Sequence, residues 1–263
     1  MIIILTEQSG DHSNRLFQAT HFEAYALEHG HKFLNFSFYD MQKYYPNAHQ
    51  NKLFFFTSIA AKALRKFKIN IAQTEFKSYH DKPYISNNIP VLLVGGWSFR
   101  AHALTSKYQD YFIRKYSIDS KICHQLKLYH LIKQWKQSGS KIIGVHIRRG
   151  DYKTWLNGKY YYPDSVYITA LTALIEQIKV SSGQDSKVIS FSNEKTYLES
   201  NFIDEASKNS WNIDHHLMSC CDYLIGPPST FTMWASYIGK NQYFHIEEAS
   251  QAVKLENFRH CIG

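Results

Sequence analysis

Two arginines, a histidine and an aspartate lie within six residues of one another: His146, Arg148, Arg149 and Asp151. Residues 142–145, directly before them, are apolar and mostly β-branched, which predicts a buried strand. Because ligands in α/β sheets bind beyond the carboxyl ends of strands, these side chains are candidate ligand contacts. A guanidinium there suits a phosphate group, since it stays charged and grips two oxygens. On charge alone, a solvated arginine pair beside a turn stays an open alternative.

The segment from His146 to Tyr152 has the sequence HIRRGDY. It resembles the HxRRGDY signature of the family-11 glycosyltransferases, the α-1,2-fucosyltransferases, which belong to a wider group with the α-1,6- and protein O-fucosyltransferases. The resemblance implies that Arg148 contacts the β-phosphate of GDP-fucose and that His146 lies near the nucleotide, partly through its backbone. Arg149 is either a second phosphate contact or a structural partner of Asp151, and we favour the structural role.

A second segment, residues 214–235, resembles the family pattern D-x-x-L-M-S-x-C followed by N-S-T-F-S-W-W-A-A. A carboxylate can accept two hydrogen bonds from the N1 and N2 edge of guanine, so Asp214 is the candidate base-binding residue. Ser229 and Thr230 follow an expected strand and begin an expected helix, where free N–H groups and hydroxyls hold a phosphate. Pro228, in place of the family's asparagine, is a departure from the pattern.

Two weaker matches add candidate residues. Residues 191–194, FSNE, fit a family segment F-S-(D/N)-(D/E), so the resemblance makes Asn193 a candidate nucleotide contact, with a helix cap as the alternative. Residues 10–18 resemble a degenerate form of the family's first element, in which Asn14 matches and Arg15 replaces a glutamine. In relatives this turn faces the cleft beneath the sugar, which makes Asn14 a candidate catalytic residue; an ordinary capped helix is the alternative.

These residues together predict an inverting glycosyltransferase that moves fucose from GDP-β-L-fucose to a glycan hydroxyl, forming an α-1,2 linkage. Arg148 would stabilise the charge that develops on the β-phosphate, while Asp151 and Asn14 are the other candidate catalytic groups. A transferase for another GDP-sugar or acceptor linkage, and an inactive carbohydrate- or nucleotide-binding relative, remain alternatives. No cofactor beyond the donor substrate is expected. Adjacent His215 and His216 would point apart, so no metal site is expected either.

Composition bounds the partners and the location. The net charge is +8 and the pI about 9.1, which favours anionic partners. No lysine–arginine block is long enough to make nucleic acid the expected partner. The four cysteines show no CxxC spacing, and free thiols in a reducing compartment account for them most simply. No apolar stretch is as long as a membrane span, so we expect a cytoplasmic protein. A basic amphipathic segment, residues 54–66, leaves peripheral association with the inner membrane and a glycolipid acceptor open.

Strand and helix patterns alternate along the chain, which predicts an α/β fold with parallel sheets. We expect strands at residues 2–5 and 32–38 around a helix at 14–29, and a helix over the tail, 249–263. The polar stretch 136–140 predicts a linker. With the resemblance, the expected architecture is GT-B-like, with two Rossmann-like domains facing across a cleft. Residues 1–138 would form the acceptor-side domain and residues 139–263 the donor-binding domain.

Overall fold

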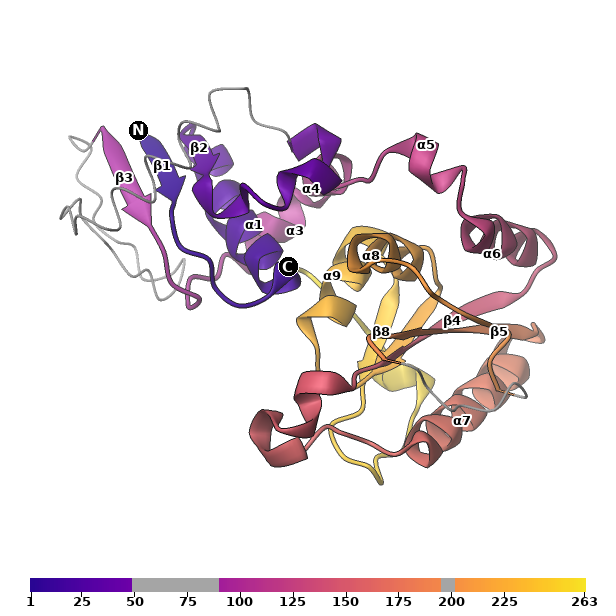
Figure 1. Cartoon of the computed structure of the whole chain (residues 1–263). Coiled ribbons are helices and arrows are strands. Elements are labelled where there is room, and N and C mark those ends of the chain that lie inside the picture. Colours follow the sequence, from indigo (N-terminus) through magenta and orange to yellow (C-terminus); the bar gives the residue numbers. More distant parts are fainter. Residues whose placement is uncertain (49–89, 195–201) are drawn as a thin grey trace. The chain divides into compact units, whose positions relative to one another are not determined.

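The computed structural model describes residues 1–48, 90–194 and 202–263, and the basic amphipathic segment 54–66 lies outside these ranges. The chain divides into two compact units, one of Met1–Ser117 with Ile262–Gly263 and one of Ile118–Cys261. Each unit is built on a parallel or mainly parallel sheet flanked by helices (Figure 1), which confirms the predicted α/β class. None of the helices in the described ranges has the length and hydrophobicity that a membrane span requires.

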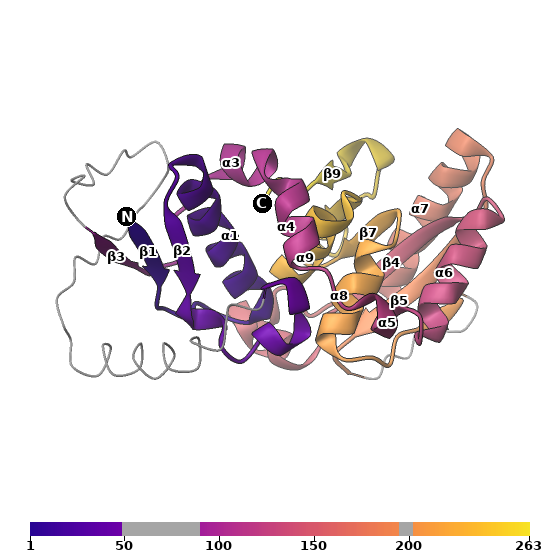
Figure 2. The ribbon, with the colours of Figure 1, turned by 90° about the horizontal axis from the view of Figure 1, so that it is seen from above.

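The N-terminal unit contains a parallel sheet with the strand order β2–β1–β3. Its elements are β1 Ile2–Leu5, α1 His12–Glu28, β2 Lys32–Asn35, β3 Val91–Val94, α3 His102–Lys107 and α4 Gln109–Lys115, with short 3₁₀ helices at Phe36–Phe38, Gln42–Tyr44 and Pro46–Ala48. Helix α1 packs along the sheet (Figure 2). Phe22 of α1 stacks on Phe99 with 4.7 Å between ring centroids. The parallel pairing of β1 with β2 confirms the predicted βαβ start.

The C-terminal unit contains a six-stranded sheet with the order β6–β5–β4–β7–β8–β9, parallel except for the β8–β9 pair. The strands are β4 Lys141–Ile147, β5 Ser186–Ser192, β6 Glu205–Ala206, β7 Tyr223–Gly226, β8 Gln242–His245 and β9 Arg259–His260. All residues of β4 after Lys141 are buried, as expected for a parallel strand that is covered on both faces. Chain order reverses at β4, because β5 lies on one side of it and β7 on the other.

Among residues 118–194 and 202–261 of this unit, the structure has five α-helices and three 3₁₀ helices. They are α5 Ser120–Cys123, α6 Lys127–Gln137, α7 Asp164–Ser182, α8 Trp211–Ser219 and α9 Thr230–Gly239, with 3₁₀ helices at Gly150–Lys153, Trp155–Gly158 and Leu255–Asn257. Helix α7 covers one face of the sheet, and α8 and α9 cover the other (Figure 1).

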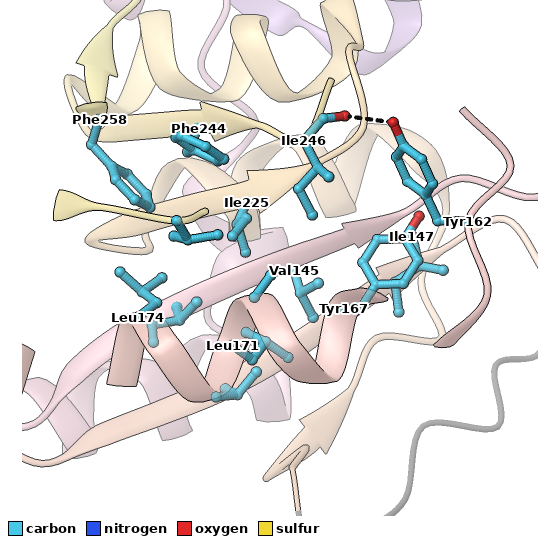
Figure 3. Packing of buried hydrophobic residues seen from close by; sticks show 14 of the residues in the cluster. Val145, Ile147, Tyr162, Tyr167, Leu171, Leu174, Ile225, Phe244, Ile246 and Phe258 are labelled. Carbon is cyan, nitrogen blue, oxygen red and sulfur yellow. Dashed lines mark hydrogen bonds between the residues drawn. The ribbon is translucent and has the colours of Figure 1, made fainter. Parts of the chain in front are cut away.

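A buried hydrophobic core lies between α7 and the sheet (Figure 3). Four side chains of α7 recur at helical spacing and are at most 1% exposed: Tyr167, Leu171, Leu174 and Ile178. They pack with strand residues that include Val145, Ile147, Ile225 and Phe244. The hydroxyl of Tyr162 donates to the carbonyl of Ile246 at 3.1 Å, which satisfies the polar end of a buried ring.

Two details differ from the sequence-based expectations. The division between the units falls after Ser117, whereas the sequence placed it after residue 138. Helix α6 packs against β4, so residues 136–140 form the end of that helix and the turn into the strand. The helix expected over residues 249–263 is wrong, because Arg259–His260 pairs with the edge of β8 while Val253 and Phe258 pack into the core.

Candidate active site

A pocket of about 210 Å³ lies at the carboxyl ends of β4 and β5 in the C-terminal unit. Its lining residues come from these strand ends, from the segment before α8, and from α8 and α9: His146, Arg148, Phe191, Ser192, Asn193, Asn209, Trp211, Asp214 and Phe231. This is the place where chain order reverses in the sheet, which is where open α/β sheets bind their ligands. The pocket brings together four predicted site residues from distant parts of the chain.

Arg148 follows β4 directly and lies in the wall of the pocket. Its side chain is 23% exposed, so it borders the pocket without extending into bulk water. A guanidinium nitrogen lies 2.9 Å from the Asp151 carboxylate, which is itself 56% exposed. The turn between them requires a glycine, since Gly150 has φ 56° and a Cβ there would lie 2.8 Å from the Asn193 amide nitrogen. Arg148 is therefore held in place while it still faces open space.

Arg149, the next residue, has a different environment. Its side chain donates to the carbonyl of Tyr162 and to the Asp164 carboxylate, and it is 8% exposed. These contacts fasten the turn after β4 to the start of α7. The favoured structural role fits this geometry, but the predicted partner was wrong: Asp151 pairs with Arg148, and Arg149 pairs with Asp164.

His146 forms part of the pocket wall as a neutral ring. Burial lowers the pKa of His146 to about 3, with smaller effects from the nearby Arg148 and His245. Its Nδ1 is hydrogen-bonded to the Thr232 hydroxyl at 3.0 Å. With this pKa the side chain is neutral at working pH and cannot supply a proton to a leaving group. It lines the same pocket as Arg148, and its contact with a nucleotide stays a prediction.

The remaining wall is aromatic. Phe231 stacks between His146, at 5.1 Å, and His215, at 3.8 Å between centroids. Trp211 meets His215 edge-on at 5.7 Å. His216, the neighbour of His215, points elsewhere and reaches Cys123 at 3.4 Å, as expected of adjacent residues. Flat aromatic surfaces of this kind offer stacking contacts to a nucleobase.

Asp214 lies on α8 in the same pocket and is 8% exposed. Its carboxylate accepts a hydrogen bond from the Ser207 hydroxyl. Burial raises the pKa of Asp214 to about 7, and the Ser207 hydrogen bond opposes this rise only partly. A buried carboxylate with one neutral partner keeps acceptor capacity for a ligand that carries N–H groups.

The other predicted residues take three different places. Asn193 lines the pocket and accepts a hydrogen bond from the Arg149 backbone N–H at 2.9 Å. Ser229 and Thr230 are not among the pocket-lining residues but begin α9, where the Ser229 hydroxyl accepts from the Phe231 N–H at 3.2 Å. Asn14 belongs to the N-terminal unit, where a Cβ at Gly10 would collide with its amide, and its catalytic role stays a prediction.

Some pocket residues were not predicted as site residues. Asn209 precedes α8, Trp211 begins it, and Phe231 lies in the first turn of α9. The polar run at 207–210 was the available signal, because such a run before a helix often makes local hydrogen bonds, and here Ser207 donates to Asp214.

Comparison with protein families decides the identity. The sequence model described as glycosyl transferase family 11 matches residues 7–256. The chain belongs to glycosyl transferase family 11. The predicted family is confirmed, and the match extends over the divergent residues 39–135, for which the sequence motifs gave almost no support.

Solved structures support the fold assignment for this family-11 glycosyltransferase. A GDP complex of a mutant of Arabidopsis thaliana FUT1 is similar, with 12% identity and a TM-score of 0.51 over 98% of this chain and 73% of that chain. The NodZ α-1,6-fucosyltransferase co-crystallized with GDP is also similar, with 15% identity and a TM-score of 0.51 over 89% of this chain and 91% of that chain. These likenesses confirm a GT-B-like fold class. No curated protein sequence matches the chain.

The departures from the family-11 pattern have structural roles in this chain. Thr232, which replaces a serine, bonds His146, and the Pro228 carbonyl accepts from the Tyr152 hydroxyl at 2.6 Å. Arg15, which replaces a glutamine, is buried in the N-terminal unit and pairs with Asp40.

Proposed function

We propose that this family-11 enzyme transfers fucose from GDP-β-L-fucose to a glycan hydroxyl with inversion and forms an α-1,2 linkage. The observation that supports this proposal most strongly is one pocket that contains both Arg148 and Asp214. A guanosine diphosphate needs a cation for its diphosphate and a carboxylate for the N1 and N2 edge of its base. Two similar solved structures, one of a FUT1 mutant and one of the NodZ α-1,6-fucosyltransferase, were determined with GDP.

In the proposed reaction, the acceptor oxygen bonds to the anomeric carbon as the bond from that carbon to the β-phosphate oxygen breaks. Negative charge develops on the β-phosphate, and Arg148 donates hydrogen bonds to it. The Asp151 carboxylate, 2.9 Å from Arg148, holds the guanidinium in position and is the group that we propose to accept the hydroxyl proton. Arginine thus takes the charge-neutralising role that Mg²⁺ has elsewhere, and the proposed reaction uses no cofactor beyond the donor.

The aromatic wall and Asp214 would hold the base. Trp211 provides a flat ring surface, while Asp214 accepts from guanine N–H groups. Asn193 lines the same pocket, accepts from the Arg149 backbone N–H, and is the proposed contact to the part of the donor between the base and the β-phosphate. Ser229 and Thr230 would add hydroxyl and N–H donors at the start of α9, provided that a phosphate extends that far.

A donor panel tests this proposal. The release of GDP or UDP would be followed with GDP-fucose, GDP-mannose and UDP-galactose, first without acceptor and then with an array of glycans. We expect GDP-fucose to be turned over and UDP-galactose to be inert. Linkage analysis of the product decides between α-1,2 and the α-1,6 linkage that NodZ forms. Turnover of GDP-mannose alone would favour the alternative donor, and no GDP release at all would indicate an inactive relative.

Arg148→Lys tests the role of the guanidinium in the same assay. Since a lysine cannot place two parallel donors, we expect kcat to fall on the order of 10²–10³. Arg259→Lys is the matched control, because Arg259 lies on the edge strand β9 and is exposed. Wild-type turnover in Arg148→Lys would show that Arg148 does not have the proposed role.

The location and acceptor class are part of the proposal as well. We propose a cytoplasmic enzyme that acts at the inner membrane surface on a glycan or glycolipid, with no nucleic-acid partner. The net charge of +8 supports attraction to an anionic surface. Cell fractionation at low and moderate salt is the direct measurement, because electrostatic adsorption weakens as salt rises.

A further inference from the structure

An aromatic loop, defined here as residues 152–162, follows the Arg148 turn directly. It contains one tryptophan and four tyrosines: Tyr152, Trp155, Tyr160, Tyr161 and Tyr162. Trp155 is 44% exposed, and its neighbour Leu156 is 56% exposed. Large exposed aromatic side chains next to a substrate pocket mark a surface for a ligand with apolar faces. Neither the family match nor the pocket assigns a role to this loop.

A continuous series of contacts joins the loop to the pocket. The Arg148 guanidinium lies 5.4 Å from the ring of Tyr152, and Tyr152 lies 4.8 Å from the ring of Trp155. Trp155 in turn lies 5.7 Å from Tyr160. The buried Tyr152 is fixed at its other end, since its hydroxyl donates to the Pro228 carbonyl at 2.6 Å. The exposed rings are therefore an extension of the wall that holds Arg148.

The loop backbone holds Trp155 outward. Leu156 and Asn157 have φ values of 47° and 58°, and Gly158 follows with φ 76°. Left-handed conformations at non-glycine residues are costly, about 1–3 kcal/mol each, and persist where the surrounding structure fixes them. Here a Cβ at Gly158 would lie only 3.2 Å from the Lys153 carbonyl, so the turn is tight. The surface around Trp155 is thus formed before a ligand arrives.

The chemistry of the surface fits a carbohydrate. A sugar ring has apolar C–H faces, which stack on aromatic rings, and hydroxyl edges, which need hydrogen-bonding groups. Trp155 and Tyr160 provide the rings, while exposed Thr154, Asn157 and Lys159 provide hydroxyl, amide and ammonium groups around them. A lipid surface fits less well, because these polar side chains and the exposed Asp151 carboxylate would have to approach the hydrocarbon.

We propose that the aromatic loop binds the acceptor glycan, with Trp155 stacking on one of its sugar rings. This assignment rests on the proposed fucosyl transfer, because the acceptor must enter beside the diphosphate that Arg148 contacts. It makes Trp155 an acceptor-binding residue with no contact to the donor. The two substrates would then meet at the turn between Arg148 and Tyr152.

Binding without donor tests the loop independently of catalysis. Saturation-transfer NMR would be measured with lactose, N-acetyllactosamine, cellobiose and a mannobiose, on the wild type, Trp155→Ala and Trp155→Phe. Ile122→Ala is the matched control, since Ile122 is 39% exposed on α5 in the same unit. GDP binding by calorimetry and GDP-fucose hydrolysis would be measured on each variant. Sedimentation with anionic phospholipid vesicles would be measured in parallel.

We expect Trp155→Ala to weaken binding of at least one disaccharide about tenfold, equivalent to ~1.4 kcal/mol, and to leave GDP binding and donor hydrolysis unchanged. Trp155→Phe should restore much of the binding, and Ile122→Ala should match the wild type. The proposal is overturned when no disaccharide signal depends on Trp155, when GDP binding falls equally, or when only vesicle binding is lost. Trp155-dependent sugar binding in a protein that neither binds GDP nor hydrolyses GDP-fucose would sink the proposed function instead.

Discussion

The two sides of the pocket carry charge in different ways. On the β4 side, Arg148 is 23% exposed and has the Asp151 carboxylate at 2.9 Å, so its charge is balanced and hydrated. On the α8 side, Asp214 is 8% exposed, and within the part of the chain that the structure describes its carboxylate accepts a hydrogen bond from the neutral Ser207 hydroxyl. Under the proposed function, the cation would be ready for the charge that develops during the reaction. Burial disfavours the charged form of the Asp214 carboxylate, and hydrogen bonds from a ligand would stabilise that form.

A comparison within the β4 side is as instructive. Arg148 and Arg149 are neighbours in sequence, yet one borders the pocket and the other is bound to Tyr162 and Asp164. Their environments differ because Arg149 is hydrogen-bonded to the start of α7, whereas Arg148 lines the pocket beside Asp151. The proposed division is that Arg148 acts on the substrate and Arg149 keeps the turn in place.

The largest stability effect is expected for Arg149→Met. This change leaves the Asp164 carboxylate and the Tyr162 carbonyl without their donor. Removing one partner of a buried ion pair costs about 3–5 kcal/mol, and the exposed part of Asp164 reduces this to roughly 2–3 kcal/mol. The midpoint Tm should fall by roughly 5–10 °C. Calorimetry gives the Tm, and GDP binding below the transition should stay close to that of the wild type.

Lys179→Met provides the control for Arg149→Met. Lys179 pairs with Asp185 at 2.7 Å, but both side chains are more than half exposed, at 56% and 77%. Pairs as exposed as this one contribute little to stability, so Tm should change by no more than a few degrees. An equal decrease in Tm in the two variants would mean that the contacts of Arg149 stabilise the protein no more than an exposed ion pair does.

The next effect concerns Asp214 and pH. Guanine N–H groups need the carboxylate form, and the pKa of Asp214 is raised to about 7 by burial. Donor affinity should therefore be highest above pH 7 and should weaken as pH falls below it. In Asp214→Asn the affinity for GDP should fall roughly tenfold to hundredfold at pH 8, because charged hydrogen bonds are lost. Calorimetric titration of GDP and UDP from pH 5.5 to 8.5 measures both trends.

Asp214 should also affect folding stability, and its contribution should decrease as pH rises, whereas donor affinity should increase. Because the pKa of Asp214 is above its usual 3.8 in the folded state, folding favours the protonated carboxyl. Its contribution to stability is full below pH 3.8 and is lost as pH rises through 7. Asp214→Asn should therefore raise Tm at pH 8 but not at pH 4, whereas the exposed Asp185→Asn should not. An Asp214→Asn protein with lower Tm at pH 8 and unchanged GDP affinity would contradict both arguments.

Much of the fold was predictable because its signals are local. The apolar run before His146 predicted β4, and the patterns at residues 2–5, 14–29 and 32–38 predicted the βαβ start of the N-terminal sheet. The tail was not predictable in this way. Its pairing with β8 and the burial of Phe258 depend on a sheet edge that only the folded chain presents.

The site was predictable where a motif fixed the residue types, as at Arg148, Asn193 and Asp214, which do line one pocket. The hydrogen-bond partners of the site residues were not predictable from the sequence. Arg149 bonds Asp164, which lies fifteen residues away, and no pattern distinguished this from the nearer Asp151. Phe231 has a sequence environment typical of the core, and only the closeness of α9 to His146 makes it part of the pocket wall.

The smallest effect is expected at Ser229, which lies at the start of α9 beside the α8 side of the pocket. Its hydroxyl caps the helix, so Ser229→Ala should cost about 1 kcal/mol and lower Tm by roughly 2–4 °C. Ser210 is the matched control, because it precedes α8 without a side-chain cap, and Ser210→Ala should change Tm less. GDP affinity separates the two roles of Ser229: a cap alone leaves it unchanged, whereas a phosphate contact weakens it. If the GDP affinity of Ser229→Ala falls while its Tm stays unchanged, the start of α9 belongs to the donor site. Thr230 and the backbone N–H groups of the first turn of α9 would then be part of that site.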